Sequence, residues 1–359
     1  MKVVTILGTR PEIIRLSCII PQLDEFCDHT IIHTGQNYDH KLNEIFFDEL
    51  GVRKPDYILD SRGTFDEQFA TIIVECARIL REIMPDRVLI LGDTNSGMSA
   101  IAAKKLGIPV YHMEAGNRCH DDRVPEEVNR KIIDASSDVL LPYTGRSRDN
   151  LIYEGVPLNK IHVTGNPIYE VLEKNEQRIG KSDILSKLGL NTGDYIIVTC
   201  HRSENVDNWA RFETILSSIR SVSRIYNKKV IISTHPRMRS RLGSTEEVVS
   251  SEIQFHEPFG FFDFGSLLRN SFCALTDSGT VQEECAIKNV PCVILRDSTE
   301  RPELIELGCG ILSSCIEQNI INAISIVTSH QEESASVPEE YLRSNVSSIV
   351  SKIILGYSP

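Results

Sequence analysis

The sequence predicts an α/β protein built from two domains, each a doubly wound parallel sheet covered by helices. Short apolar strands alternate with helical segments along the chain, which is typical of βαβ units. A length of 359 residues suits two domains of ordinary size better than one core. Turn residues at 165–167 precede a charged stretch, so we place the first domain at residues 1–166, the second at 167–340 and a final segment at 341–359.

The first domain contains apolar runs of strand length that are bounded by turn residues. We expect strands at residues 2–8, 29–35, 87–93, 109–113, 138–143 and 160–167. Apolar residues recur at helical spacing between these runs, which predicts helices from Pro11 to about Glu25 and over residues 64–83, 96–107 and 125–137. Strands joined through helices pair in parallel, so ligand-binding side chains should gather where the strands end.

The second domain repeats this alternation. We expect strands at residues 194–201, 228–236, 251–258, 273–279 and 291–297. Helices are expected over residues 208–226, 280–289 and 338–356, the last of these at the end of the chain. Two similar domains of this kind would face each other across a central cleft.

The composition excludes several classes of protein. Lys and Arg number 38 against 50 Asp and Glu, and the net charge of −12 argues against nucleic acid or a membrane surface as a partner. No apolar run is long enough to span a membrane, and the first apolar stretch is too brief for a signal peptide, so we expect a cytoplasmic protein. Ten cysteines include no CxxC pair, which favours reduced core thiols over disulfides or a metal site.

The segment at residues 112–130, HMEAGNRCHDDRVPEEVNR, concentrates ionisable side chains between a strand and a helix. Glu114 directly follows the strand, Glu126 opens the helix, and Asp93 ends the neighbouring strand. Carboxylates crowded at one sheet edge repel each other, so some should hold or give a proton at neutral pH. That chemistry suits proton abstraction or cleavage of a glycosidic C–O bond. Glu127 fits instead the ordinary preference of helix N-termini for acidic residues.

Basic residues at other strand ends predict a site for a polyanion. Arg10 lies in the turn GTRPE, just before a helix start whose amides can bind an anion. His201 and Arg202 end the first strand of the second domain, and His235 ends the next. GTRPE is neither a P-loop nor a GxGxxG motif, so the spacing does not indicate ATP or NAD.

The segment TDSGTVQEE, at residues 276–284, supplies a matching feature in the second domain. Ser278, Gly279 and Thr280 are small and stand at a helix N-terminus, where they suit a diphosphate. One turn later, one of Glu283 and Glu284 could accept two ribose hydroxyls while the other faces solvent.

Ten short motifs follow one another over the whole chain: GTRPE, HTGQNYD, GDTNS, HMEAGNR, PEEVNR, VTGNP, HRSEN, THP, DSGTVQEE and TERPE. In this order they make the chain resemble the non-hydrolysing UDP-N-acetylglucosamine 2-epimerase family. The resemblance implies a GT-B-like pair of Rossmann-type domains, a homodimer, and a last helix that packs back on the first domain. Arg15 stands where the family usually has lysine, and Thr280 replaces the second glycine of DSGG. These departures resemble a branch that epimerises modified sugars, either the 6-deoxy UDP-L-talosamine to UDP-L-fucosamine pair or a diacetamido-uronate.

The resemblance also assigns roles by position. The groups that would hold the diphosphate are Arg10, His201, Ser278, Gly279 and Thr280. Glu284 would bind the ribose, and Phe264 would stack near the uracil. The catalytic groups would be Asp93, Glu114, Glu126 and His201. The remaining substrate contacts would come from Arg15, Gln36, Arg202, His235 and Arg301.

The reaction that the resemblance implies inverts one stereocentre of a UDP-amino sugar. A base removes the proton at C2, and UDP leaves C1 by anti elimination to give a 2-acetamidoglycal. UDP then adds back, and C2 is protonated on its opposite face. This chemistry requires no cofactor and no metal, and it would supply sugars for a capsule or O-antigen.

Three alternatives remain open at this point. A hydrolysing relative would release UDP and a free reducing sugar, whereas a GT-B glycosyltransferase would require an acceptor. A catalytically silent module would only bind a nucleotide sugar, and fold alone does not exclude it. The presence of Asp93, Glu114, Glu126 and His201 favours an enzyme over that module.

Overall fold

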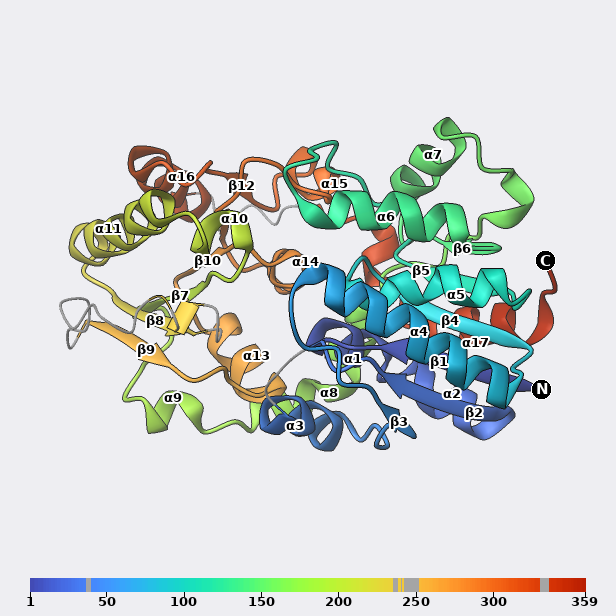
Figure 1. Cartoon of the computed structure of the whole chain (residues 1–359). Coiled ribbons are helices and arrows are strands. Elements are labelled where there is room, and N and C mark those ends of the chain that lie inside the picture. The colour runs from blue at the N-terminus through green and yellow to red at the C-terminus, as the bar shows by residue number, and fades with distance from the viewer. Residues whose placement is uncertain (37–39, 235–237, 240, 242–251, 330–335) are drawn as a thin grey trace. The chain divides into compact units, whose positions relative to one another are not determined.

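The computed structural model describes residues 1–36, 40–234, 238–239, 241, 252–329 and 336–359 (Figure 1). Met1–Lys174 and Glu339–Pro359 together form one compact unit, called the first unit below. Asn175–Pro338 form the second unit. Each unit contains one parallel sheet with helices, which confirms the predicted fold class.

The sheet of the first unit has six parallel strands in the order β3-β2-β1-β4-β5-β6. The strands are β1 (Lys2–Leu7), β2 (Asp28–His33), β3 (Tyr57–Ile58), β4 (Arg87–Leu91), β5 (Val110–Met113) and β6 (Val139–Leu141). This is the Rossmann order, in which the direction of strand addition reverses between β1 and β4. Every residue of β4 and β5 is buried, as expected for strands covered on both faces.

Helices of the first unit follow the strands in the βα alternation that the sequence predicts. They are α1 (Arg10–Leu16), α2 (Ile19–Phe26), α3 (His40–Leu50), α4 (Phe65–Ile83), α5 (Ser99–Lys105), α6 (Pro125–Ser136), α7 (Gly145–Tyr153) and, from the end of the chain, α17 (Val346–Gly356). Ile72, Cys76 and Ile79 of α4 pack on β1 and β4 in one hydrophobic core. α8 (Ile168–Gly180) continues from this unit into the second.

The second unit repeats the same strand order, β12-β11-β10-β7-β8-β9, again with every pairing parallel. The strands are β7 (Tyr195–Thr199), β8 (Lys229–Ser233), β9 (Ile253–His256), β10 (Cys273–Thr276), β11 (Cys292–Ile294) and β12 (Ile311–Leu312). The reversal of strand order lies between β7 and β10, and that is where a ligand of an open sheet is expected.

Helices of the second unit build two hydrophobic cores with its sheet. The helices are α9 (Ile184–Lys187), α10 (Ser203–Val206), α11 (Trp209–Tyr226), α13 (Phe261–Arg269), α14 (Gly279–Lys288), α15 (Pro302–Glu306) and α16 (Glu317–Ser329). One core joins α11 and α16 to the sheet, and the other joins α13 and α14 to it. Alternate residues of β7 serve the two cores, since Ile196 lies in one and Ile197 in the other.

Three expected elements differ in the structure. The segment predicted as one helix over residues 338–356 contains a short 3₁₀ helix, η4 (Glu339–Leu342), and then α17, because Asn345 is the N-cap at which the α-helix begins. The helix predicted from Pro11 to about Glu25 is interrupted between α1 and α2 at Ser17, whose hydroxyl donates to the Ile14 carbonyl over 2.7 Å. Pro21 explains the break, because a proline in a helix interior removes one backbone donor and clashes with the carbonyl four residues earlier.

The strand predicted at residues 160–167 is also absent as a strand. The chain follows β6 there with a single bridge between Leu140 and Ile161, and Thr164 N donates to the Pro142 carbonyl over 3.0 Å. Gly165 has a φ of +92°, and Pro167 follows it, so the backbone turns away before a ladder can form.

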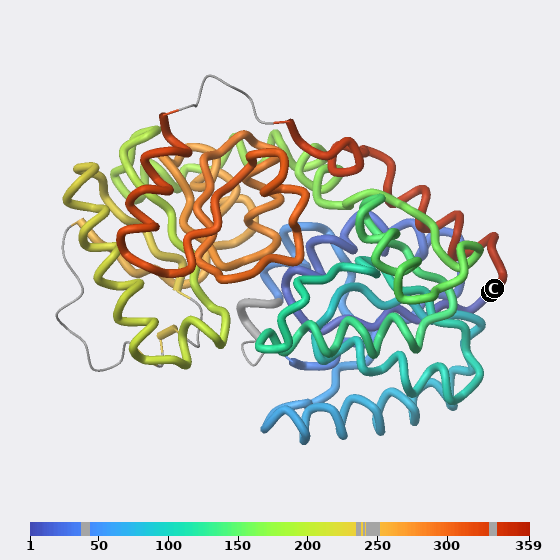
Figure 2. The backbone as a smooth tube through the Cα atoms, turned by 90° about the horizontal axis from the view of Figure 1, so that it is seen from above, coloured from blue at the N-terminus to red at the C-terminus, as the bar shows by residue number. Residues whose placement is uncertain are grey.

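The end of the chain belongs to the first unit. α17 packs against α2 (Figure 2), and Gln22 Nε2 donates to Ser347 Oγ over 2.8 Å. Ser347 N donates in turn to Glu170 Oε2 over 2.8 Å, and Arg87 bonds the carbonyl of Ile354.

Two expectations from composition bear on the described residues. All ten cysteines are free thiols, and seven of them are buried. No helix in the described part of the chain is both long and apolar enough to cross a membrane.

Candidate active site

The turn after β1 holds a carboxyl group that the sequence reading did not single out. Glu12 is buried, and its Oε2 accepts hydrogen bonds from Gly8 N over 2.5 Å and Thr9 N over 2.9 Å. Its Oε1 accepts from Thr94 Oγ1 over 2.5 Å. Burial raises the pKa of Glu12 to about 7, although these three bonds act in the opposite direction. The available signal was the spacing Thr9-x-x-Glu12, which is a capping box.

Gly8 is required in this turn by a close approach. A Cβ at this position would lie 2.0 Å from Thr34 Oγ1 and 2.3 Å from Ser96 Oγ. Ser96 also donates to Gln36 Oε1 from its backbone amide and its hydroxyl, both over 3.3 Å. The turn therefore fits closely against the ends of β2 and β4.

Arg10 is the first residue of α1 and is partly exposed. Its guanidinium carbon lies 5.8 Å from the centre of the Phe46 ring, a cation–π distance. The α1 N-terminus and the Arg10 side chain thus supply positive potential at the same strand end.

Glu114 stands at the end of β5 with a left-handed φ of +64°, which is uncommon for a residue other than glycine. Its Oε2 accepts from Arg15 Nη1 over 2.6 Å, and both side chains are buried. Its Oε1 accepts from Asn117 Nδ2 over 3.3 Å. The structure therefore joins two predicted site residues, Arg15 and Glu114, in one ion pair.

Asp93 is also paired with an arginine. Arg130 of α6 places Nε 2.8 Å and Nη2 2.6 Å from Asp93 Oδ2, while its Nη1 donates to Glu127 Oε2 over 2.6 Å. We expected carboxylates crowded against one another, but Asp93 and Glu114 each have a guanidinium as partner. An adjacent cation favours the ionised carboxylate.

Glu126 and Glu127, at the start of α6, differ in exposure. Glu126 is partly exposed, whereas Glu127 is fully buried and accepts from Cys119 N over 3.0 Å and from His120 N over 3.1 Å. We expected Glu127 to reflect only the preference of helix N-termini for acidic residues, and this was wrong. Its buried carboxylate fixes the backbone of the loop before α6.

A buried polar network supports the ends of β4 and β5. His112 places Nδ1 2.8 Å from Asp134 Oδ1 and Nε2 2.8 Å from the Gly92 carbonyl, so both ring nitrogens face acceptors. Asp134 Oδ2 accepts from Gly116 N over 3.1 Å and from Arg118 Nη2 over 2.7 Å. Burial opposes ionisation of Asp134, but the bonds and charges of His112 and Arg118 lower its pKa. This network holds the two backbone segments that carry Asp93 and Glu114.

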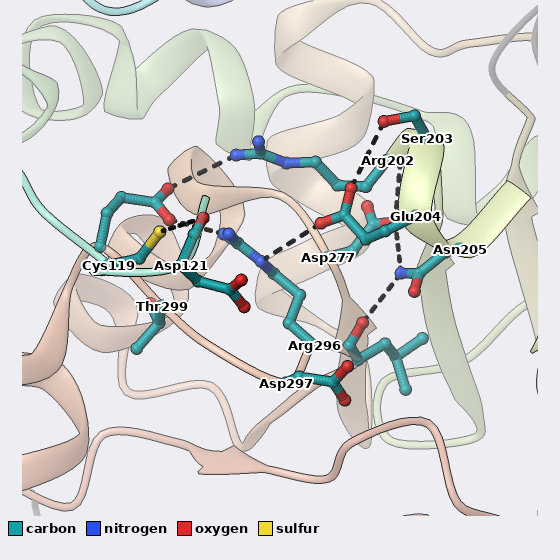
Figure 3. Close-up of polar contacts among 12 residues, drawn as sticks. Cys119, Asp121, Arg202, Ser203, Glu204, Asn205, Asp277, Arg296, Asp297 and Thr299 are labelled. Atoms are coloured by element: carbon teal, nitrogen blue, oxygen red, sulfur yellow. Dashed lines mark hydrogen bonds and ion pairs between the residues drawn. The ribbon is translucent and has the colours of Figure 1, made fainter. Parts of the chain in front are cut away.

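In the second unit, Asp277 organises the ends of β7 and β10 (Figure 3). Its carboxylate accepts from Arg202 N over 2.9 Å and from Asn205 Nδ2 over 2.9 Å, and Figure 3 labels these three residues. It also accepts from His201 N over 3.1 and 3.0 Å. His201 Nδ1 lies 3.1 Å from Asp277 Oδ1. Burial would raise the pKa of Asp277, yet the His201 charge and these bonds hold it well below its usual range. The sequence reading missed Asp277, which orients His201.

Arg202 belongs to a buried set of ion pairs centred on Glu300. The Arg202 Nη2 donates to Glu300 Oε1 over 3.4 Å, and Arg296 Nη1 donates to Glu300 Oε2 over 2.7 Å. Arg301 bonds Glu300 as well, and its Nε donates to Glu283 Oε1 over 2.5 Å. Three guanidinium groups thus meet two carboxylates beside the N-terminus of α14.

The N-terminus of α14 is formed by the predicted small residues. Ser278 is its N-cap and Gly279 its first residue; a Cβ at position 279 would lie 2.2 Å from Arg301 Nη1. The first amides of a helix have no partner within it, so they are available to an anion. Glu283 and Glu284 are both buried, so the expectation that one of them faces solvent was wrong.

Two further predicted residues have different outcomes. Phe264 lies in α13, where it is partly buried against the core of the second unit. His235 lies outside the described residues. Among the residues that the structure describes, no group of three or more His, Cys, Asp or Glu side chains is arranged to hold a metal ion.

Comparison with known proteins identifies the family. The sequence profile of the family described as UDP-N-acetylglucosamine 2-epimerase matches residues 22–355. The chain is 41% identical over 337 residues to the UDP-N-acetylglucosamine 2-epimerase of Methanocaldococcus jannaschii, which covers 91% of this chain and 92% of that relative. The chain belongs to the UDP-N-acetylglucosamine 2-epimerase family. It is therefore an epimerase of UDP-sugars, an isomerase acting on carbohydrates.

Other members of the family extend this result. The UDP-2,3-diacetamido-2,3-dideoxy-D-glucuronate 2-epimerase of Pseudomonas aeruginosa is 35% identical over 331 residues, 90% of this chain and 91% of that protein. The solved M. jannaschii epimerase in complex with UDP-GlcNAc and UDP has a TM-score of 0.93, with 38% identity and full coverage of both chains. The Rickettsia bellii epimerase has a TM-score of 0.92 at 40% identity, covering 99% of this chain and 96% of its own. The GT-B-like fold of the family is thereby established for this chain.

Proposed function

We propose that this epimerase inverts C2 of a UDP-N-acetylated amino sugar by anti elimination of UDP and re-addition. A carboxylate takes the C2 proton, the C–H electrons form a C1=C2 double bond, and the C1–O bond breaks so that UDP leaves with that electron pair. UDP oxygen then attacks C1 of the 2-acetamidoglycal while C2 accepts a proton on the other face. The proton and the electron pair are both returned, so the net change is the inversion of C2.

The observation that carries this proposal is the pairing of two carboxylates with arginines at the ends of adjacent strands. Asp93 follows β4 beside Arg130, and Glu114 follows β5 beside Arg15. Because these pairs favour the ionised form, both groups are suited to act as bases. Glu126, partly exposed on the first turn of α6, is the third acid–base group of the proposal.

We assign the proposed diphosphate contacts to residues near two helix N-termini. Arg10 with the α1 N-terminus, and His201 with Ser278, Gly279 and Thr280 at the α14 N-terminus, supply cations and amides suited to phosphate oxygens. Asp277 orients the His201 ring, which would donate to the leaving diphosphate. The further proposed substrate contacts are Gln36, Arg202, His235, Glu284, Arg301 and Phe264.

The proposed substrate is UDP-GlcNAc interconverting with UDP-ManNAc, or a 6-deoxy or diacetamido relative. The relative at 41% identity acts on UDP-N-acetylglucosamine, and that at 35% acts on a diacetamido-glucuronate. We further propose that the enzyme is a cytoplasmic homodimer that supplies sugars for a capsule or O-antigen.

The test is proton NMR of the purified enzyme with a panel of UDP-amino sugars in deuterated water. With one of these sugars, the epimeric product should carry a single deuterium at C2. Small amounts of UDP and glycal should also appear in solution. Glu114→Gln and Glu126→Gln should lower turnover by roughly 10²–10⁴-fold. Their UDP affinity should stay within a few-fold of the wild type. Free reducing sugar as the main product would favour a hydrolysing enzyme, and protium retained at C2 would contradict the elimination.

A further inference from the structure

Arg130 occupies an unusual position between two carboxylates. Its side chain is 2% exposed, and it is held within α6, one turn after Glu127. Nε and Nη2 lie 2.8 and 2.6 Å from Asp93 Oδ2, and Nη1 lies 2.6 Å from Glu127 Oε2. A guanidinium is planar and rigid, so fixing one edge of it fixes the direction of the other.

Glu127 fixes one edge. It accepts the backbone amides of Cys119 and His120 over 3.0 and 3.1 Å in addition to Arg130 Nη1. Burial would raise the pKa of Glu127, but the Cys119 amide and Arg130 together lower it. Glu127 is therefore a buried anion with a fixed place, and it holds the guanidinium so that the other edge faces Asp93.

The charge around Asp93 shows why it needs this cation. Arg130, from α6, and Glu12, from α1, are charged side chains that interact with Asp93, and the Asp93 charge increases the proton affinity of Glu12. Asn129 Nδ2 donates to the Asp93 carbonyl over 3.0 Å and carries no charge. Arg130 thus places a positive charge beside Asp93 that offsets the charge of the neighbouring acid.

We propose that Arg130 is a positioning residue for the epimerisation: anchored by Glu127, it orients Asp93 and keeps it ionised at the working pH. This inference rests on the acid–base role proposed for Asp93. In the motif PEEVNR, Glu127 and Arg130 would then act through Asp93 and would not contact the sugar.

The test compares the pH dependence of turnover in Arg130→Gln, Arg130→Lys and the wild type. Without the cation Asp93 takes up its proton at higher pH, so the acid limb of Arg130→Gln should move up by about one pH unit or more. Its maximal turnover should fall by about 10- to 100-fold, since a bond to a charged group is lost. Arg130→Lys keeps the positive charge but loses the planar guanidinium that contacts both Asp93 and Glu127. Its acid limb should therefore stay in place, and its turnover should lie between those of Arg130→Gln and the wild type. UDP affinity by calorimetry should change less than a few-fold in both.

Arg118 supplies a matched control. It is also 2% exposed, and it pairs with two carboxylates, Asp134 and Glu154, none of them a proposed acid–base group. Arg118→Gln should lower stability and turnover without moving the acid limb. An equal shift in Arg118→Gln, or an acid limb of Arg130→Gln at the wild-type pH, would overturn the proposal.

Two more variants keep the result decisive. If Arg130→Gln does not fold, Glu127→Gln/Arg130→Gln removes one buried anion together with the cation, and its acid limb should show the same shift. Asp93→Asn separates this inference from the proposed function. Near-normal turnover of Asp93→Asn would remove the role of Asp93 and this inference with it. An inactive Asp93→Asn beside an unmoved acid limb in Arg130→Gln would refute only the inference.

Discussion

Replacing Glu12 by glutamine should remove a pH-dependent loss of stability. The carboxyl of Glu12 is buried, and its pKa is raised from 4.5 to about 7. Between these values the native state retains a proton that the unfolded state has released, so stability falls as pH rises from 4.5 and levels off above 7. The interval corresponds to about 3 kcal/mol, at ~1.36 kcal/mol for each unit of pKa.

Glu12→Gln is a conservative change at this position. Its amide oxygen can accept from Gly8 N and Thr9 N as Oε2 does, and its NH₂ group can donate to Thr94 Oγ1. The three bonds are kept while the titration is lost. At pH 5 the stability of the variant should therefore lie within about 1 kcal/mol of the wild type. At pH 8 its first unit should unfold at a temperature higher by up to roughly 6–12 °C.

Scanning calorimetry without UDP is the appropriate measurement, since a ligand would stabilise the native state and mask the effect. The single tryptophan, Trp209, lies in the second unit and would not report on the first. Glu67→Gln is the control, because Thr64 and Glu67 form the same capping box on the exposed start of α4. Parallel stability curves for Glu12→Gln and the wild type from pH 5 to pH 8 would refute the reasoning.

Two further predictions concern anion binding, and a third concerns the stability of the second unit. Arg10→Ala should weaken UDP binding by about 1.5–3 kcal/mol by calorimetry; unchanged affinity would remove Arg10 from the anion site. Gly279→Ala would place a Cβ 2.2 Å from Arg301 Nη1 and 2.8 Å from Glu300 Oε1, so UDP affinity should fall at least about tenfold, and wild-type affinity would refute the steric argument. Asp277→Asn should destabilise the second unit by at least about 2 kcal/mol at pH 7 in thermal unfolding, because four bonds to a buried carboxylate are weakened. An equally stable variant would contradict the assigned role of Asp277.

The ends of the strands could be predicted from the sequence, because the local pattern of apolar and turn residues determines them. Apolar runs followed by Gly or by charged residues predicted the ends of β1, β4, β5, β7 and β10 to within three residues. Parallel pairing then brought Asp93 and Glu114 to one sheet edge, and His201 and Ser278 to another. The predicted helix at residues 11–25 failed where Pro21 overrode the apolar periodicity.

The ion-pair partners of the site residues could not be predicted from the sequence in this way. Arg15 and Glu114 are 99 residues apart, and Asp93 and Arg130 are 37 apart, so no local pattern pairs them. Glu127 was expected to serve only the helix N-terminus, and one of Glu283 and Glu284 was expected to face solvent. Glu127 and Glu283 are buried instead, because arginines reach them in the folded unit. Such pairs depend on which helices cover which strand end, and that is decided by tertiary packing.

The return of α17 to the first unit bears on how the chain folds during synthesis. Domains usually form in order as they emerge from the ribosome. Here α2, which comes early in the chain, packs against α17, which comes after the whole second unit. All of the second unit is translated in the interval. The first unit therefore cannot be completed until the second unit has been translated, and removal of α17 would uncover α2 in the unit that carries Asp93 and Glu114.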